Sequence, residues 1–259
     1  LKTVLEKCNF SGEIEMFASA FPWASRTLAS LYIVQSRALS CLNNLIIDAP
    51  STSSDLGIGL APQALWASVE SVLSQALVIA SKYSDDSEKL APLGEAAREL
   101  VEECAATLAS LAQVKLTWVP TLEPLLRVLA SDIGPTDPAA LHTVRALSRA
   151  ALQGPRTVGD IESVASALIS IVVDEASGLE LQAAAIDGMI DMFAEAPETA
   201  LLKPIHKRVK EALTQIQPAF KRRVFFERKR ADAQLKDRLD ECRINLSRFL
   251  KYKASQNLS

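Results

Sequence analysis

Along most of the chain, apolar residues recur at steps of three and four, and the recurrence is interrupted by Pro, Gly or short Ser/Asp clusters. This spacing is typical of amphipathic α-helices, whereas half-buried strands alternate with a period of two. The run Leu168–Val173 is also compatible with a buried strand, but it continues a longer helical pattern. The pattern therefore predicts an all-α protein.

The interruptions divide the chain into a series of predicted helices. Pro62 suits the first turn of one helix, and others are expected to begin near Pro124 and Pro138. We expect a loop at 49–61 and a bend at Pro204. The predicted helices cover residues 12–20, 24–47, 62–83, 88–113, 124–131, 138–152, 159–173, 179–195, 198–217 and 219–253.

Two of these helices carry an apolar stripe that indicates which face is buried. In helix 24–47 the stripe consists of Leu28, Leu31, Ala38, Leu42 and Leu45. In the last predicted helix the stripe has steps of 4, 3, 4 and 3, and its members are Leu235, Leu239, Cys242, Leu246 and Phe249.

Short Ala-Leu or Ala-Ile motifs recur at similar places in different helices. They begin at Ala38, Ala76, Ala146 and Ala185, with spacings of 38, 70 and 39 residues. Because 70 is close to two units, the period is near the roughly 40 residues of HEAT and armadillo repeats. We therefore expect a HEAT/armadillo-like α-solenoid, a right-handed superhelix of antiparallel helix pairs. The alternative is an irregular helical bundle with coincidental Ala-Leu pairs.

Charge changes the picture because it is unevenly distributed. The 259 residues have a net charge of only −3. Residues 1–200 hold 12 basic and 25 acidic side chains, whereas residues 201–259 hold 16 basic and 6 acidic ones. An asymmetry of this kind indicates charged partners or contact between the two segments. No apolar run approaches roughly 18 residues, so no membrane-spanning helix is expected.

The sequence contains few of the residues that catalysis or metal binding requires. Its two histidines, His142 and His206, lie in no catalytic motif, and we expect surface or capping roles for them. The four cysteines are widely spaced, and Cys41 and Cys104 are interpreted as small buried apolar residues in a reducing compartment. We therefore predict no enzyme activity, no catalytic or metal site and no cofactor.

Two charged groups are the candidate interaction residues. The candidate acidic surface consists of Asp85, Asp86, Glu88, Glu99, Glu102, Glu103, Asp174, Glu175 and Glu180. A negatively charged solenoid attracts basic proteins and speeds their encounter. The candidate basic patch consists of Lys221, Arg222, Arg223, Arg228, Lys229 and Arg230.

The basic end of the chain has three interpretations. It is a helix that caps the last repeat, a site for RNA or another polyanion, or a nuclear-localisation-type cluster. The first interpretation divides the chain into helical repeats at 1–217 and a basic capping helix at 218–259.

Two stretches carry a family resemblance. Residues 36–45 (SRALSCLNNL) and 245–253 (NLSRFLKYK) resemble the repeat helix and the chain ending of symportin-type HEAT/armadillo proteins. Since the chain begins at Leu1, we expect it to be the C-terminal HEAT part of a longer solenoid.

That resemblance implies a transport adaptor and chaperone found in cytoplasm and nucleus. Its implied partners are basic, 5S-rRNA-binding ribosomal proteins and an importin, with nucleic acid secondary and no membrane. One alternative is a generic scaffold in trafficking or chromatin complexes. The other is an RNA-binding protein that uses the basic C-terminal helix.

Overall fold

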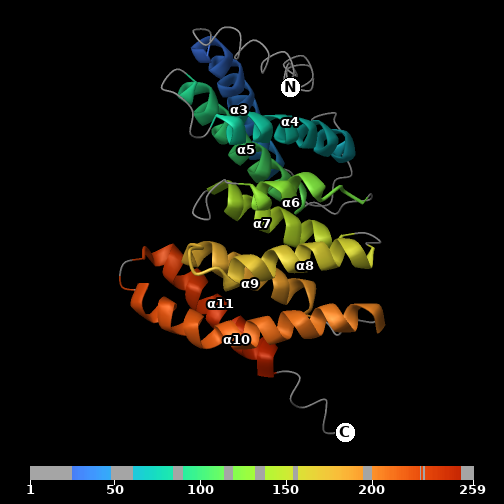
Figure 1. Ribbon diagram of the computed structural model, residues 1–259, viewed down its shortest axis with the longest axis vertical. Helices are drawn as coiled ribbons and strands as arrows, with labels where there is room; N and C mark the ends of the chain where they lie inside the picture. Colours follow the sequence, from blue (N-terminus) through green and yellow to red (C-terminus); the bar gives the residue numbers. More distant parts are fainter. Residues whose placement is uncertain are drawn as a thin grey trace. The chain divides into compact units, whose positions relative to one another are not determined.

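The computed structural model describes residues 25–47, 61–83, 90–113, 119–131, 138–153, 157–194, 200–227, 229 and 231–251. Within these ranges every regular element is a helix, which confirms the predicted all-α class (Figure 1). The elements are α3 (Ser25–Ile47), α4 (Pro62–Lys82), α5 (Ala91–Leu111), α6 (Glu123–Ala130), α7 (Pro138–Ala151), α8 (Val158–Val173), α9 (Leu179–Met192), η2 (Ala200–Leu202), α10 (Lys203–Glu227) and α11 (Ala233–Lys251).

The predicted helices between residues 24 and 195 are confirmed, and their ends differ from the observed ends by at most three residues. Local signals explain several of the starts. Pro62 and Pro124 each lie in the first turn of a helix, where a missing N–H costs nothing. Thr157 and Asp160 form a capping box at the start of α8, with reciprocal hydrogen bonds of 3.1 and 3.3 Å. The predicted helix 12–20 and the loop 49–61 lie outside the described residues.

The predicted division of the C-terminal part into helices 198–217 and 219–253 is wrong. Helix α10 continues through Pro218, and Pro204 lies in its first turn instead of at a bend. Pro218 is exposed, so water can reach the backbone carbonyl that loses its hydrogen bond. The observed break precedes α11, where the Asp232 carboxylate accepts a hydrogen bond from the backbone N–H of Leu235 at 2.8 Å.

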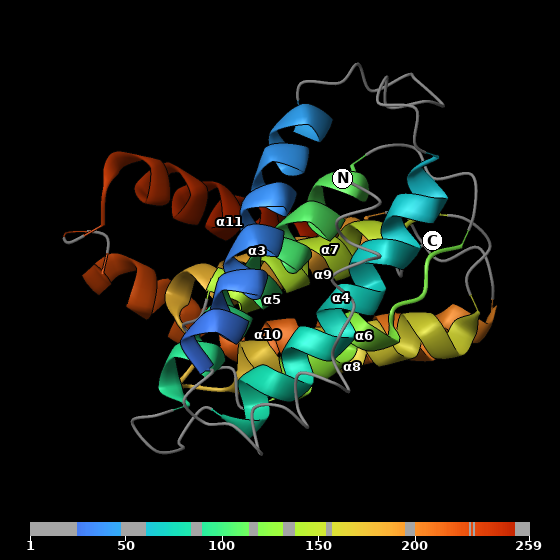
Figure 2. The same ribbon diagram turned by 90° about the horizontal axis from the view of Figure 1, so that it is seen from above.

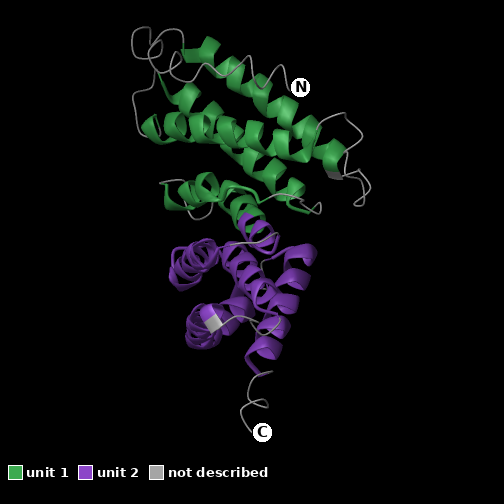
Figure 3. Ribbon diagram, turned by 90° about the vertical axis from the view of Figure 1, so that its right-hand side faces the viewer, with its two compact units in different colours: residues 1–134, 138–146 green, residues 135–137, 147–259 purple. Residues whose placement is uncertain are grey.

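The chain forms two compact units (Figure 3). Unit 1 comprises residues 1–134 and 138–146, and unit 2 comprises residues 135–137 and 147–259. The predicted boundary at residues 217 and 218 separates repeats from a cap inside unit 2, and α10 runs through it. That functional division stays a prediction.

In unit 1, α5 packs against both α3 and α4, and it runs between them in Figure 2. Most of its residues are buried, including Leu93, Leu100 and Leu108. Small residues permit the close approach of the neighbouring helices. A Cβ atom added at Gly94 would lie 2.5 Å from the carbonyl oxygen of Tyr83, so this position requires glycine.

The stripe predicted for helix 24–47 lies at the edge of the buried face and not at its centre. Leu45 is exposed and Leu28, Leu31 and Ala38 are only partly buried, whereas Leu42 is buried as expected. The buried face of α3 includes small and polar residues, and its members are Ser25, Ala29, Tyr32, Gln35, Ser36, Leu39, Leu42 and Ile46. Close helix packing selects residue size as well as apolarity, and an apolar stripe alone does not contain that restriction.

In unit 2, α9 is the central helix, since α8, α10 and α11 all pack against it. It also approaches the end of α7, because a Cβ atom added at Gly188 would lie 2.7 Å from the Cβ atom of Ser148. The stripe predicted for α11 is confirmed at Leu239, Cys242 and Leu246, which are fully buried, whereas its end members Leu235 and Phe249 are partly buried. This part of the prediction succeeded because α11 buries an ordinary apolar stripe.

One described helix, α4, is long and apolar enough to cross a membrane by length and composition. Half of its most apolar window is buried inside unit 1, where Leu65, Val69 and Leu73 lie in the core. A core helix of this kind passes the same test, so its apolarity is explained by packing against α5.

Candidate interaction surfaces

The candidate acidic residues lie in separate parts of the fold. Asp85, Asp86 and Glu88 are outside the described residues. Glu99, Glu102 and Glu103 lie on α5 in unit 1. The remaining three, Asp174, Glu175 and Glu180, lie around the α8–α9 turn in unit 2. The structure thus divides the predicted acidic surface into two groups, one in each unit.

The α5 group lies at the edge of the α3–α5 contact. Glu99 is exposed, and Glu102 and Glu103 are partly buried. Burial raises the pKa of Glu103, and the neighbouring Glu99 raises it further, whereas Arg37 and Ser40 of α3 lower it. Glu99 therefore offers the fully solvated charge of this group.

A second acidic pair in unit 1 was not anticipated from the sequence. Burial raises the pKa of Glu70 on α4, and the charge of Glu123 on α6 raises it further. Glu123 in turn forms an ion pair with Arg127 at 2.5 Å. The two glutamates are 53 positions apart in the sequence, so only the packing of α6 on α4 brings them together.

Asp174 has a structural role in the turn that joins α8 to α9. Its carboxylate accepts hydrogen bonds from the Ala176 N–H and the Ser177 hydroxyl, both at 3.0 Å. Its backbone carbonyl accepts a hydrogen bond from the Gln182 amide at 2.9 Å. Glu175, in contrast, is exposed at the tip of the turn.

Two candidate residues of opposite charge are engaged inside unit 2. Arg223 of α10 donates to Gln182 Oε1 at 2.7 Å and to the Ser177 carbonyl oxygen at 3.2 Å. Glu180 of α9 accepts a charged hydrogen bond from Arg238 of α11 at 2.5 Å. Arg223 and Glu180 therefore stabilise the packing of α9, α10 and α11. Because their charged groups are already hydrogen-bonded within unit 2, they are less available to a partner protein.

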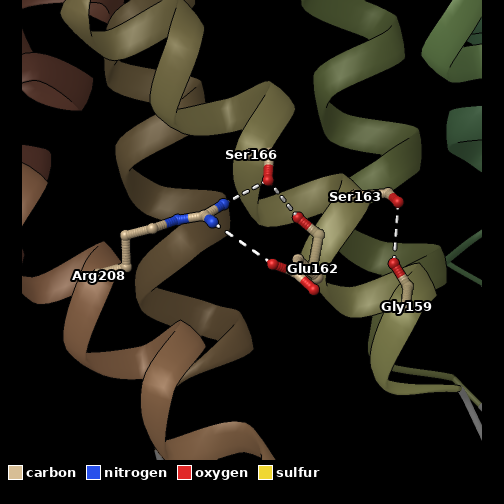
Figure 4. Close-up of polar contacts among 5 residues, drawn as sticks. All are labelled: Gly159, Glu162, Ser163, Ser166 and Arg208. Atoms are coloured by element: carbon tan, nitrogen blue, oxygen red, sulfur yellow. Dashed lines mark hydrogen bonds and ion pairs between the residues drawn. The ribbon is translucent and has the colours of Figure 1, made fainter.

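Arg208 makes a third contact of the same kind. In Figure 4 its guanidinium reaches from α10 toward Glu162 and Ser166 on α8. The distance from Arg208 Nη1 to Glu162 Oε1 is 3.4 Å. Three arginines of the basic segment thus contact the helices that immediately precede it.

These contacts change the meaning of the charge asymmetry. When charges are counted over the two compact units, unit 1 contains 10 basic and 15 acidic residues. Unit 2 contains 18 basic and 16 acidic residues. The net charges are therefore −5 and +2. Much of the positive charge of residues 201–259 is therefore balanced by acidic residues of the same unit.

The rest of the candidate basic patch is on and after α10. Arg222 and Lys229 are exposed, and Lys221 is partly buried. Arg228 and Arg230 lie outside the residues whose side chains are described. Phe225 and Phe226, which lie between the two groups of basic residues, are 66% and 69% exposed and contact each other edge to face. Solvent-exposed aromatic rings beside cations are a common feature of interaction surfaces.

Two expectations for cysteine and histidine are corrected. Cys41 is exposed, whereas Cys104 is buried as expected. His206 is also buried, between the rings of Phe193 and Phe249 at centroid distances of 5.5 and 6.0 Å. The cationic residues around His206 suggested a surface position, but the helical turn directs it to the core face of α10.

A partly buried polar cluster lies between α7, α9 and α11. Burial raises the pKa of Asp187 to about 6, an effect that the Cys242 thiol partly offsets. Burial also raises the pKa of Asp191, and the charge of Arg149 partly offsets that increase. Asp187 Oδ1 has no hydrogen-bond partner among the described residues. Within the described part of the chain, no three His, Cys, Asp or Glu side chains are placed to hold a metal ion.

A cavity with a volume of about 640 Å³ lies in unit 2. Its walls come from the end of α8, from α9 and from the second half of α10. The lining includes Val173, Ile186, Phe220 and Phe226, together with Arg222. This hollow is mostly apolar, with a few charged side chains (Glu175, Arg222, Arg223 and Glu227), and such a lining is typical of a binding site.

A family model described as SYO1-like, TPR repeats matches residues 1–257. No curated protein matches the chain. A match over nearly the whole length, together with the stacked helices, establishes an α-solenoid class of helical repeats.

Proposed function

We propose that this chain, which belongs to the SYO1-like family of TPR repeats, is a non-enzymatic transport adaptor and chaperone. The family is a helical-repeat scaffold type, and such repeats present extended surfaces to partner proteins. The family match is the observation that carries the proposal, and it agrees with the symportin-type resemblance seen in the sequence.

The proposed cargo is a basic ribosomal protein, specifically one that binds 5S rRNA, carried together with an importin between cytoplasm and nucleus. The charge of unit 1, which is net −5, supports a basic cargo because opposite charge steers association. Glu99 is the best-placed contact on α5, since it is exposed and lies one turn from Glu103.

The test is a direct titration of the purified chain with a 5S-rRNA-binding ribosomal protein at low and moderate salt. We expect binding that weakens as salt rises. Glu99→Lys should reduce the affinity about tenfold. Asp237→Lys on α11, which makes the same charge change at another exposed carboxylate, should reduce it less than about twofold. Equal effects of the two substitutions, or no binding, would contradict the proposal.

RNA binding through the basic segment is the second candidate function. Arg222 and Lys229 are exposed, and they lie near two exposed phenylalanine rings. Single-stranded nucleic acid binds such combinations by phosphate pairing and base stacking. An oligo(U) titration in which Arg222→Glu abolishes binding would favour this function over a generic scaffold in trafficking or chromatin complexes.

A further inference from the structure

We propose that the groove along α10 in unit 2 binds an amphipathic, acidic segment of a second protein partner. This surface is called the α10 groove, and it is defined by the stripe Gln215, Ala219, Arg222 and Phe226. It is distinct from the acidic α5 group that the proposed function uses, and neither inference rests on the other.

The stripe is a consequence of helical geometry. Its members follow at steps of 4, 3 and 4, so they lie on one face of α10. Ala219 in the middle is small and leaves the groove open, whereas Phe226 closes one end with a ring that is 69% exposed. On the opposite wall Val173, which is 56% exposed, ends α8.

The floor of the groove is apolar and already folded. Val172, Ile186 and Phe220 line it and are buried. The cavity of about 640 Å³ is large enough for one or two apolar side chains of a partner. Burial of such a side chain against Phe226 and Val173 would remove apolar surface from water on both molecules, which is the main favourable term in association.

The charge of α10 favours an acidic occupant, because this helix carries seven Lys or Arg residues and two Glu residues. Its Arg222 and Arg223 line the groove, and Arg222 is exposed. A second hollow of about 400 Å³ shares Gln215 with the first and is lined by Lys207, Lys210 and Glu211 farther along α10. The carboxylate of Glu211 beside them is 3.8 Å from Lys207 Nζ.

Two carboxylates remain beside Arg222. Glu227 lies 3.6 Å from Arg223 and is therefore partly neutralised. Glu175 contributes negative charge from the α8–α9 turn, so the occupant should place its carboxylates toward α10 and away from this turn. This asymmetry fixes which side of the groove the acidic residues of the partner occupy.

The length of the surface indicates the form of the occupant. From Gln215 to Phe226 the stripe extends about 17 Å along the helix. This distance suits about three turns of an amphipathic helix, with apolar residues at steps of three and four facing the groove. A base-stacking platform would use Phe225 and Phe226 alike, but only Phe226 lines the apolar hollow. The geometry therefore favours a protein segment over RNA.

The test uses the full chain and three fluorescein-labelled probes in anisotropy titrations. The first probe is a designed helix of about three turns with a Leu/Phe stripe flanked by Glu residues. The second replaces every Glu by Lys, and the third is oligo(U). We expect the acidic helix to bind, and the basic helix to bind at least about tenfold more weakly.

Matched substitutions on adjacent residues locate the site. Phe226→Ala and Arg222→Glu should each weaken binding of the acidic helix about tenfold. Their controls are Phe225→Ala, which truncates an equally exposed ring outside the groove, and Lys221→Glu, which makes the same charge change outside it. Each control should change the affinity less than about threefold. Because Arg222 and Phe226 are exposed, both variants should retain the wild-type circular dichroism spectrum.

Several outcomes would overturn the proposal. One is an equal loss of affinity for the acidic helix in each substitution and its control. The others are tighter binding of the basic helix, and no binding of the acidic helix up to roughly 1 mM. Binding of oligo(U) that depends on both rings, without binding of the acidic helix, would assign the surface to RNA instead. None of these results bears on cargo binding at Glu99, which is measured with a different probe.

Discussion

Arg238 Nη1 of α11 lies 2.5 Å from Glu180 Oε1 of α9, so two charges that the sequence assigned to different segments form one ion pair. Each side chain is 39% exposed. The pair therefore helps to fix the last helix on the unit that precedes it, and it is screened by solvent.

A double-mutant cycle with Arg238→Ala and Glu180→Ala should give a coupling energy of about 0.2–1 kcal/mol. The measurement is urea unfolding followed by circular dichroism, and the coupling should decrease at high salt. Glu180→Ala should also leave the binding of basic cargo unchanged. A strong loss of cargo binding would mean that Glu180 contacts the cargo directly.

Gly188→Ala should destabilise the protein by about 1–3 kcal/mol, because the new methyl group would lie 2.7 Å from Ser148 Cβ and force α9 away from α7. Gly159→Ala is the matched control. There the nearest atom to an added Cβ is Thr157 Oγ1 at an ordinary 3.7 Å, so the same substitution should be neutral or stabilise by up to about 1 kcal/mol. Similar melting temperatures for the two variants would contradict the observed contact.

Asp187 should make unit 2 less stable as pH rises. Its pKa is about 6 in the folded protein, chiefly through burial, and an unfolded aspartate has a pKa near 3.9. Between these values the folded state binds more protons than the unfolded state, so stability falls from about pH 4 to about pH 6 and stays lower above that.

Asp187→Asn removes this contribution, and its effect is measured as a difference from wild type in urea unfolding at several pH values. The variant should gain relative stability as the pH increases across that window. The difference separates Asp187 from Glu70 and Glu103, whose pKa values are also raised. A difference that does not vary with pH would contradict the prediction.

Cys41 should react rapidly with a thiol reagent in the native protein, because it is exposed. Cys104 and Cys242 are buried, and burial raises the pKa of both thiols, so they should react only after unfolding. The measurement is a count of modified thiols with and without denaturant in a Cys8→Ser background. Rapid native reaction of Cys242 would show that α11 opens readily.

The sequence was sufficient where the buried face of a helix consists of its apolar residues alone. The stripe of α11 was predicted because Leu239, Cys242 and Leu246 are simply the apolar positions. The face of α3 was not, since Ser36 and Gln35 are buried beside α5 and Leu45 is exposed. Residue hydrophobicity alone does not contain the size restriction that a closely packed neighbour imposes.

The candidate charged residues show a different limit. Sequence composition identified Glu180 and Arg223 as charges, but only the packing of α9, α10 and α11 shows that both are engaged within unit 2. In the same way, the groove beside Phe226 is formed by residues of α8, α9 and α10. The residues that face each other across it are far apart in the sequence. Such pairings depend on tertiary contacts that no local pattern specifies.

Because α5 packs against both α3 and α4, the smallest part of unit 1 that keeps these contacts contains all three helices. In many helical arrays, units of two helices can be added or removed. Here the two outer helices share one inner partner, so removing α5 would expose the core faces of both at once. Deletion or grafting experiments should therefore treat α3, α4 and α5 as an indivisible triplet, with slow amide exchange concentrated in α5.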